Sequence, residues 1–225
     1  NDADSPRMAG VVFTYPNVNS VITGNYIDNA FIEMTNEHDA NPDFGVEFSF
    51  GGLTVTGNIF RMSDAADWSS WIVVKPYGPG HFIQGLSVTG NTFKSINGNL
   101  DRIEKVDTTF ATLDMSRMRN IVFEGNTFNG VSDPCFNPVS LEFTQSSAAT
   151  NWTLDPSRYL PFGGWARTIE SLVFVGPLQN SGNNAVGTIP YVTNNYGSSS
   201  NQIQLTFPQS TKGSVRAMIR IDNPI

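Results

Sequence analysis

An eight-residue motif recurs four times along this chain of 225 residues, at nearly constant intervals. Its pattern is apolar-x-apolar-x-Gly-Asn-x-aromatic, and the Gly residues of consecutive copies lie 33, 33 and 35 positions apart. The copies cover residues 20–27, 53–60, 86–93 and 121–128. Self-similarity at such a period is typical of proteins that stack one structural unit on the next. The repeat therefore predicts a solenoid, and a degenerate fifth copy at 172–176 would extend it.

Each copy has the alternation of a β-strand followed by a tight turn. Leu86 and Val88 alternate with Ser87 and Thr89, a period of two that sends alternate side chains to opposite faces of a sheet. Gly permits a positive φ and Asn tolerates it, so the strand ends there. We expect the Asn side chains of stacked coils to hydrogen-bond one another, and the Phe that follows to stack inside. The expected turn residues are Gly24, Asn25, Gly57, Asn58, Gly90, Asn91, Gly125 and Asn126.

Two-residue Gly-Asn hairpins are the alternative interpretation of the motif. Antiparallel hairpins would not need the same motif every 33 residues, whereas stacked parallel coils do. A helical repeat would need a period of 3.6 and better helix formers. The pattern therefore favours an all-β chain that forms a parallel β-helix.

A second set of alternating segments lies between the Gly-Asn copies. They begin 8, 15, 23 and 16 residues after the preceding Gly, so each coil has two recognisable strands joined by loops of unequal length. A solenoid tolerates such loops on one side. Alternation predicts that Ile32 and Met34 point inward while Glu33 points outward. The four segments are residues 32–35, 72–75, 113–116 and 141–144.

Composition excludes several other classes of protein. Charged residues make up 15% of the chain, and aromatic residues 12%, which is opposite to the composition of disordered proteins. The net charge of −7 disfavours nonspecific nucleic-acid binding, which needs clustered Lys and Arg. No window approaches about 20 consecutive apolar residues, so we expect no membrane insertion. The single Cys135 excludes an internal disulfide.

The stacked Val-x-Gly-Asn-x-Phe coils resemble the right-handed parallel β-helix of the pectate-lyase-like superfamily, over roughly residues 11–178. That superfamily includes polysaccharide lyases, glycoside hydrolases and bacteriophage tailspikes. The calcium-binding acidic run and the basic residues of pectate lyases have no counterpart in this sequence. Scarce Lys, irregular loops and a distinct C-terminal part make the chain most similar to a phage tailspike or tail fibre. The resemblance implies a virion-tail or extracellular protein, and a homotrimer.

The C-terminal part differs from the repeat. Asn-, Ser- and Gly-rich loops precede two alternating segments, 202–207 and 214–221, which we expect to pair as a hairpin across 208–213. An open coil end exposes unpaired strand edges unless it is capped. We therefore expect a parallel β-helix over 1–179 and a C-terminal β cap over 180–225, which is either a monomeric cap or an oligomerisation region.

Acidic residues on the second set of strands are the candidates for catalysis. If these strands stack in register, Asp114 and Glu142 lie on adjacent coils, about 4.8 Å apart at the backbone. Two carboxyl groups that close are the arrangement of a retaining glycosidase. The alternative is that they are solvated acids paired with nearby Arg residues. Glu33 is the third candidate. The acidic loop 37–43 lacks the spacing of a known metal motif, so we expect neither a metal nor another cofactor.

Aromatic residues in the loops are the candidates for binding a substrate. Sugars offer apolar ring faces that stack on Trp and Tyr, while acids and amides bind their hydroxyl groups. The alternative is packing in the core or at a subunit interface. The candidates are Trp68, Trp71, Tyr77 and His81 in one region, and Trp152, Arg158, Tyr159 and Trp165 in another.

The sequence thus predicts a tailspike-like protein that recognises a surface polysaccharide of a host, with avidity from a trimer. One alternative is a polysaccharide-degrading hydrolase or lyase. Another is a purely structural stalk or tip of a tail.

Overall fold

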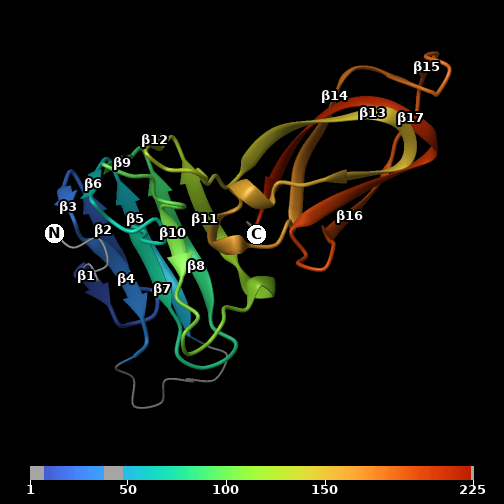
Figure 1. Cartoon of the computed structure of the whole chain (residues 1–225). Helices are drawn as coiled ribbons and strands as arrows, with labels where there is room; N and C mark the ends of the chain where they lie inside the picture. The colour runs from blue at the N-terminus through green and yellow to red at the C-terminus, as the bar shows by residue number, and fades with distance from the viewer. Residues whose placement is uncertain (1–7, 38–47, 224–225) are drawn as a thin grey trace. The chain divides into compact units, whose positions relative to one another are not determined.

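The computed structural model describes residues 8–37 and 48–223, and these form strands, loops and three short 3-10 helices. They divide into two compact units (Figure 1). Unit 1 ends at Phe136, and unit 2 comprises Asn137–Asn223. Most of the acidic loop 37–43 lies outside the described residues. No helix in the described ranges is long and apolar enough to cross a membrane.

Unit 1 is a β-solenoid of about three turns, built from three parallel sheets. Successive strands of the chain belong to different sheets, so each coil adds one strand to each sheet in turn. Sheet A contains β1 (Ala9–Phe13), β4 (Phe31–Thr35), β7 (Ile72–Lys75) and β10 (Glu104–Val106). Sheet B contains β2 (Ser20–Thr23), β5 (Ser49–Thr56), β8 (Phe82–Thr89) and β11 (Arg119–Glu124). Sheet C contains β3 (Tyr26–Asp28), β6 (Ile59–Ser63), β9 (Thr92–Ile96) and β12 (Thr127–Asn129).

The repeat sets the register of sheet B. Leu53 pairs with Leu86 and Val55 with Val88, each 33 positions further along. These residues are fully or almost fully buried, while Thr56 and Thr89 on the alternate positions are partly exposed. The stacked parallel strands confirm the prediction of a parallel β-helix and exclude Gly-Asn hairpins within unit 1.

The Asn residues of the motif form the expected ladder. The backbone N–H and the side-chain N–H of Asn58 both donate to Oδ1 of Asn91, each at 3.0 Å. Asn25 donates in the same way to Asn58, and Asn91 to Asn126. The side chain of Asn91 also donates to the backbone oxygen of Val55 at 2.9 Å. Each Asn thereby satisfies turn groups of two coils, at the point where Gly adopts a positive φ.

The aromatic position of the motif forms a stack inside the solenoid. The ring centroids of Phe60 and Phe93 lie 4.8 Å apart, with an angle of 14° between the planes. Phe93 and Phe128 follow at 6.0 Å and 10°. Phe60 and Phe93 are completely buried. The expectation that these residues stack inside is confirmed.

The third segment of the second set, 113–116, is not a strand, which corrects that prediction. Asp114 precedes the 3-10 helix η1 (Met115–Arg117), and its Oδ1 accepts hydrogen bonds from Ser116 N and Oγ at 2.9 and 2.6 Å. Such local bonds from an Asp side chain compete with strand pairing. The strand that stacks on β7 is instead β10, in which Glu104 pairs with Ile72 and Lys105 with Val73.

Unit 2 is an antiparallel sheet with the order β13-β17-β14-β15, and β16 pairs with β17 as well. The central strand β17 runs the length of the sheet, and its inward residues Val215, Ala217 and Ile219 are completely buried. The strands are β13 (Val139–Leu154), β14 (Thr168–Gln179), β15 (Ala185–Val186), β16 (Tyr191–Tyr196) and β17 (Gln202–Arg220), and the remaining helices are η2 (Ser157–Tyr159) and η3 (Pro161–Gly163).

Three expectations about this part of the chain are corrected. Segment 141–144 lies in β13 and segment 172–176 in β14, and both pair antiparallel with β17 rather than stacking as coils. Segments 202–207 and 214–221 are not two strands of a hairpin, because β17 runs without interruption from Gln202 to Arg220. The compact units divide after Phe136, whereas the sequence analysis places the end of the solenoid at 179.

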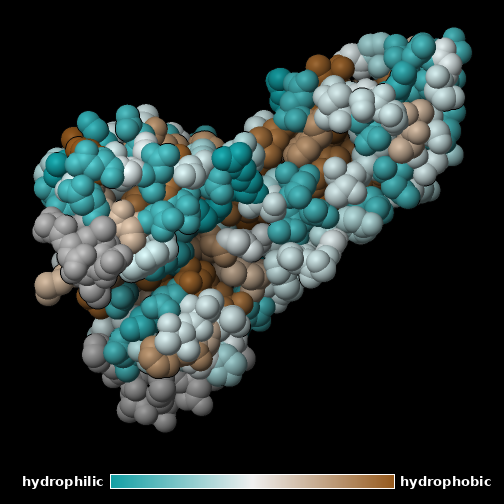
Figure 2. Space-filling view, in the orientation of Figure 1, coloured by the Kyte–Doolittle hydropathy of each residue, from teal (hydrophilic) through white to brown (hydrophobic). Residues whose placement is uncertain are grey.

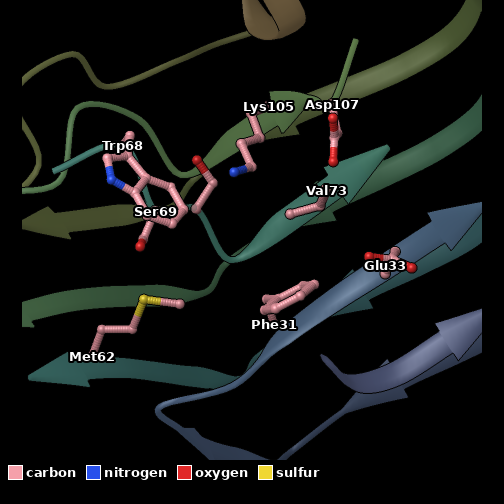
Figure 3. A pocket seen from close by; sticks show the side chains of 9 residues that line it. Phe31, Glu33, Met62, Trp68, Ser69, Val73, Lys105 and Asp107 are labelled. Atoms are coloured by element: carbon pink, nitrogen blue, oxygen red, sulfur yellow. The ribbon is translucent and has the colours of Figure 1, made fainter. Parts of the chain in front are cut away.

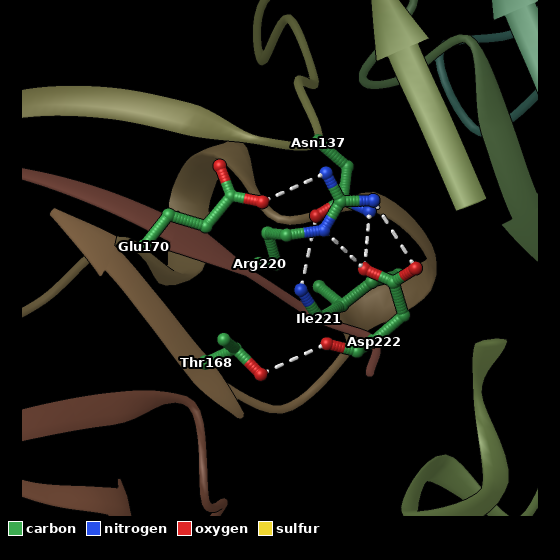
Figure 4. Close-up of polar contacts among 6 residues, drawn as sticks. All are labelled: Asn137, Thr168, Glu170, Arg220, Ile221 and Asp222. Carbon is green, nitrogen blue, oxygen red and sulfur yellow. Dashed lines mark hydrogen bonds and ion pairs between the residues drawn. The ribbon is translucent and has the colours of Figure 1, made fainter. Parts of the chain in front are cut away.

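A buried polar cluster joins the two ends of unit 2 (Figure 4). The guanidinium of Arg220 donates to both carboxylate oxygens of Asp222, at 2.8 and 3.2 Å. Asn137 donates to the same carboxylate at 3.0 Å and accepts from the backbone N–H of Ile221 at 3.0 Å. Arg220 also forms an ion pair with Glu170 at 3.3 Å. Because Asn137 and Asp222 are completely buried, these contacts fix the first and last residues of the unit against each other.

Candidate functional site

A pocket of about 200 Å³ lies against the outer face of sheet A (Figure 3). On this face the strand register aligns Glu33 of β4, Val73 of β7 and Lys105 of β10 in one row. Figure 2 shows hydrophobic residues gathered in a hollow of the otherwise mostly hydrophilic surface of unit 1. The pocket is lined by Phe31, Glu33, Met62, Trp68, Ser69, Ser70, Val73, Lys105 and Asp107.

Trp68 is held on the wall of the pocket by a tight turn between β6 and β7. Asp67 Oδ1 accepts from the backbone N–H of Trp68 at 2.8 Å, and Ser69 N–H donates to the backbone oxygen of Ala66 at 2.9 Å. The Trp68 side chain remains 54% exposed. The ammonium group of Lys105 lies 4.9 Å from the centroid of its ring, a cation–π contact. The site thus combines an exposed aromatic face with a positive charge on a rigid strand.

Two carboxylates line the same pocket, and the surroundings of Asp107 are the better defined. Asp107 extends β10, because its N–H donates to the backbone oxygen of Val74 at 2.8 Å. Its Oδ1 accepts from Thr109 N and Oγ1 at 3.1 and 2.6 Å. Burial acts to raise the pKa of Asp107, but these bonds and the charges of Lys75 and Lys105 lower it below its usual value. Asp107 is therefore ionised at neutral pH, two residues along the strand from Lys105, which lies across Val73 from Glu33.

A second aromatic group lies further along the same strands. Tyr77 stacks on Phe110, with ring centroids 4.2 Å apart, and Phe110 is exposed. The Lys75 ammonium lies 5.5 Å from both ring centroids and donates to Glu37 Oε2 at 3.2 Å. The charge of Lys75 also lowers the pKa of Asp107. The Lys75 ammonium group therefore interacts both with the two rings and with a carboxylate that lines the pocket.

The three acids predicted to be catalytic lie on different elements. Glu33 lies on the outer face of β4 as expected and lines the pocket. Asp114 caps η1 and is not on a strand, while Glu142 lies on β13 of unit 2, where it pairs with Arg216 at 3.1 Å. The in-register stacking on which the pair Asp114 and Glu142 depended is therefore absent. Glu142 instead fits the alternative of a solvated acid paired with Arg.

The predicted binding residues near the pocket also divide into two groups. Trp68 lines the pocket and Tyr77 lies beside it on the surface. Trp71 and His81 are completely buried, so they belong to the core. Trp71 packs on Phe93 with ring centroids 5.4 Å apart, and His81 packs against aromatic rings of the interior and reaches the backbone oxygen of Tyr77 at 2.7 Å.

The other four predicted binding residues belong to unit 2. Trp152 is buried, and its indole N–H donates to the backbone oxygen of Thr211 at 3.1 Å. Arg158 is exposed, with its guanidinium 6.0 Å from the ring centroid of Tyr159 in η2. Tyr159 and Trp165 are half-buried. None of these four lines the described pocket of unit 1.

Lys105 and Asp107 are site residues that the sequence analysis missed. The short strand Glu104–Val106 has a charged inward residue, Glu104, so it lacks the apolar alternation of the other strands. Its register provides the missing signal, because Ile72 pairs with Glu104, 32 positions further along. Applying the period of the Gly-Asn motif to segment 72–75 would have found β10. Among the described residues, no group of three or more His, Cys, Asp or Glu is placed to hold a metal ion.

Comparison of the chain with protein-family models, curated proteins and solved structures gave no significant match.

Proposed function

We propose that the protein binds a polysaccharide on the outer face of sheet A, in the pocket beside Trp68. The observation that carries this proposal is the exposed indole on the wall of a pocket of about 200 Å³, next to carboxylate, ammonium and hydroxyl groups. The apolar face of a sugar ring packs on an indole, and its hydroxyl groups need hydrogen-bonding partners around the rim. The polar groups lie on strands whose positions are fixed by the solenoid, and the indole lies in the turn that leads into one of them.

The arrangement of aromatic rings along the surface supports a ligand that is a chain of sugars. The stacked rings of Tyr77 and Phe110 lie beyond the pocket along the same strands, so a second sugar could pack there. Two aromatic faces on one sheet suit a repeating polymer, whose units gain affinity from being linked.

Replacing Trp68 tests the proposal. We expect Trp68→Ala to weaken binding to a recognised polysaccharide more than tenfold, because buried aromatic anchors carry much of the energy of an interface. Retardation of the protein in native gels that contain different polysaccharides measures this. Tyr191→Ala is the matched control, since Tyr191 is 78% exposed and belongs to unit 2. Equal retardation of both variants, or no retardation of the unaltered protein by any polysaccharide, would contradict the proposal.

Polysaccharide hydrolysis is the second candidate function, and the observation that favours it is the pair Glu33 and Asp107 in one pocket. They belong to strands two positions apart in sheet A, and Asp107 lies two residues beyond Lys105, which is in register with Glu33, so their backbones are roughly 12 Å apart. This spacing suits the wider pair of an inverting glycosidase better than the narrow pair of a retaining one. Release of reducing ends by the unaltered protein, lost in Glu33→Gln and in Asp107→Asn with binding kept, is the expected result. Release that survives both substitutions would exclude this pair.

The proposal also includes the finer likeness to the pectate-lyase-like superfamily. We infer a right-handed solenoid, a capping or oligomerisation role for the C-terminal sheet, and a tailspike-like homotrimer on a virion tail or in an extracellular setting. The parallel coils and their Asn ladder support the likeness at the level of architecture. Light scattering coupled to size-exclusion chromatography tests the trimer, and a monomer at micromolar concentration would contradict it.

A further inference from the structure

The charges around the pocket differ from those that an acidic polysaccharide requires. Glu33 and Asp107 contribute two carboxylates to the lining, and Lys105 contributes the one ammonium among the lining residues. The next cation along β7, Lys75, already forms an ion pair with Glu37. The lining is therefore net negative, and so is the whole chain, with a formal charge of −7. A negative cleft attracts cations and repels anions.

One face of the Trp68 ring already accepts an ammonium group. The Nζ atom of Lys105 lies 4.9 Å from the ring centroid, which is a distance at which the ring quadrupole attracts a cation. Lys105 has a long flexible stem, and its charge also acts on Asp107. The pocket thus shows, within its own chain, an ammonium group in cation–π contact with this indole.

Resting on the proposed function, we infer that the sugar taken by this pocket carries a protonated amino group, as in a polymer of N-unsubstituted hexosamine. The sugar ring packs on Trp68, and its ammonium group donates to one of the two carboxylates of the lining, Glu33 or Asp107. Charge-assisted hydrogen bonds of this kind are about twice as strong as neutral ones. A uronic acid in the same position would place its carboxylate against two others and gain a single ammonium partner.

Matched oligosaccharides test the inference directly. Titration calorimetry compares a β-1,4-linked glucosamine hexamer, the same hexamer fully N-acetylated, and a galacturonate hexamer. The buffer is held below the pKa of the sugar amine and above the pKa of Asp107. We expect the glucosamine hexamer to bind about tenfold more tightly than its acetylated form, and the uronate to bind most weakly. The pair of hexamers differs only at the amino group, so the ratio isolates that contact.

The outcomes separate this inference from the function on which it rests. Equal binding of the free and acetylated hexamers, or tighter binding of the uronate, overturns the amino-sugar inference and leaves the polysaccharide proposal intact. Absence of binding by all three, together with no retardation by any polysaccharide, overturns both.

Removing a negative charge and removing a positive charge from the pocket should change the preference for the glucosamine hexamer in opposite directions. A merely structural effect would not depend on the sign of the charge that is removed. Glu33→Gln should reduce the preference for the glucosamine hexamer, and Lys105→Met should increase it, because each alters the charge that the ammonium group meets. The preference is the ratio of the affinities for the free and the acetylated hexamer, so a loss of binding that is common to both hexamers cancels. Lys94→Met is the control for net charge, since Lys94 lies on sheet C and is exposed. A shift of the same sign for Lys105→Met and Glu33→Gln would contradict the inference.

Discussion

At the scale of single residues, the solenoid depends on side chains that serve two coils at once. Asn91 is buried, accepts two hydrogen bonds from Asn58 and donates to Asn126 and to the backbone of Val55. Each bond satisfies a group of a turn that would otherwise be buried without a partner. The Gly-Asn motif is therefore a structural feature, and the candidate chemistry lies elsewhere, on the outer face of sheet A.

The ladder predicts unequal effects of the same substitution at its middle and at its end. Asn91→Ala should lower the free energy of unfolding by about 2–4 kcal/mol, because it leaves buried groups of two neighbouring coils unpaired. Asn25→Ala, in the first copy of the motif, should cost about 1 kcal/mol, because Asn25 is exposed and donates in one direction only. Urea denaturation of both variants measures this, and equal losses would show that the ladder is not the cause.

The Asp107 carboxylate should contribute a pH-dependent part of the stability. Its folded-state pKa is lowered, so the contribution is present above the ordinary value of 3.8 and is lost as the pH falls through the folded pKa. We expect the difference in urea midpoint between the unaltered protein and Asp107→Asn to be constant at neutral pH and to shrink below about pH 4. A difference that stays constant down to pH 2 would contradict the assigned pKa shift.

At the scale of elements, the close approach of neighbouring coils limits what the strands can contain. Gly51 in β5 has a φ of 135°, and a Cβ atom there would lie 2.0 Å from the backbone oxygen of Gln84 in β8. Gly90, at the turn after β8, has a φ of 62° and nothing within 4 Å of the same position. Gly51 is thus required because a Cβ atom would collide with the backbone of the neighbouring strand. Gly90 is required because of its backbone conformation alone.

The two Gly residues predict a graded pair of variants. Gly90→Ala should cost about 1–2 kcal/mol, the penalty of a left-handed conformation for a residue with a Cβ atom. Gly51→Ala should cost more than about 3 kcal/mol, because β5 and β8 must also separate locally. Chemical denaturation of both variants, with circular dichroism to confirm folding, gives the order. Gly90→Ala as the more damaging change would contradict the register of β5 and β8.

At the scale of the whole molecule, two units use different kinds of sheet. Unit 1 stacks parallel coils around buried aromatic and aliphatic columns, and unit 2 pairs long antiparallel strands along β17. Each unit has its own buried residues, which is the property of a part that unfolds cooperatively by itself. Arg220, Asp222 and Asn137, which form the buried polar cluster, are all residues of unit 2.

Breaking that cluster should affect one unit only. Asp222→Ala leaves the buried Arg220 without its bidentate partner, so we expect a loss of about 3–5 kcal/mol in the stability of unit 2. Hydrogen exchange followed by mass spectrometry should show faster exchange across 137–223 and unchanged exchange in the strands of unit 1. Faster exchange in both units to the same degree would contradict their independence.

The sequence by itself determined the solenoid, the strand alternation and the positions of the Gly-Asn ladder, because these depend on local periodicity repeated at a constant interval. It also predicted that Glu33 faces outward on its strand and that Trp68 lies in a loop, and both positions depend on neighbours in sequence. Only the tertiary structure decided that Asp114 caps a 3-10 helix, that 141–144 and 172–176 pair antiparallel, and that Asp107 joins Glu33 in one pocket. Alternation is the same in parallel and antiparallel strands, so it carries no information about the partner strand. Pairing is a contact between distant residues, and it is this contact that assembles the site.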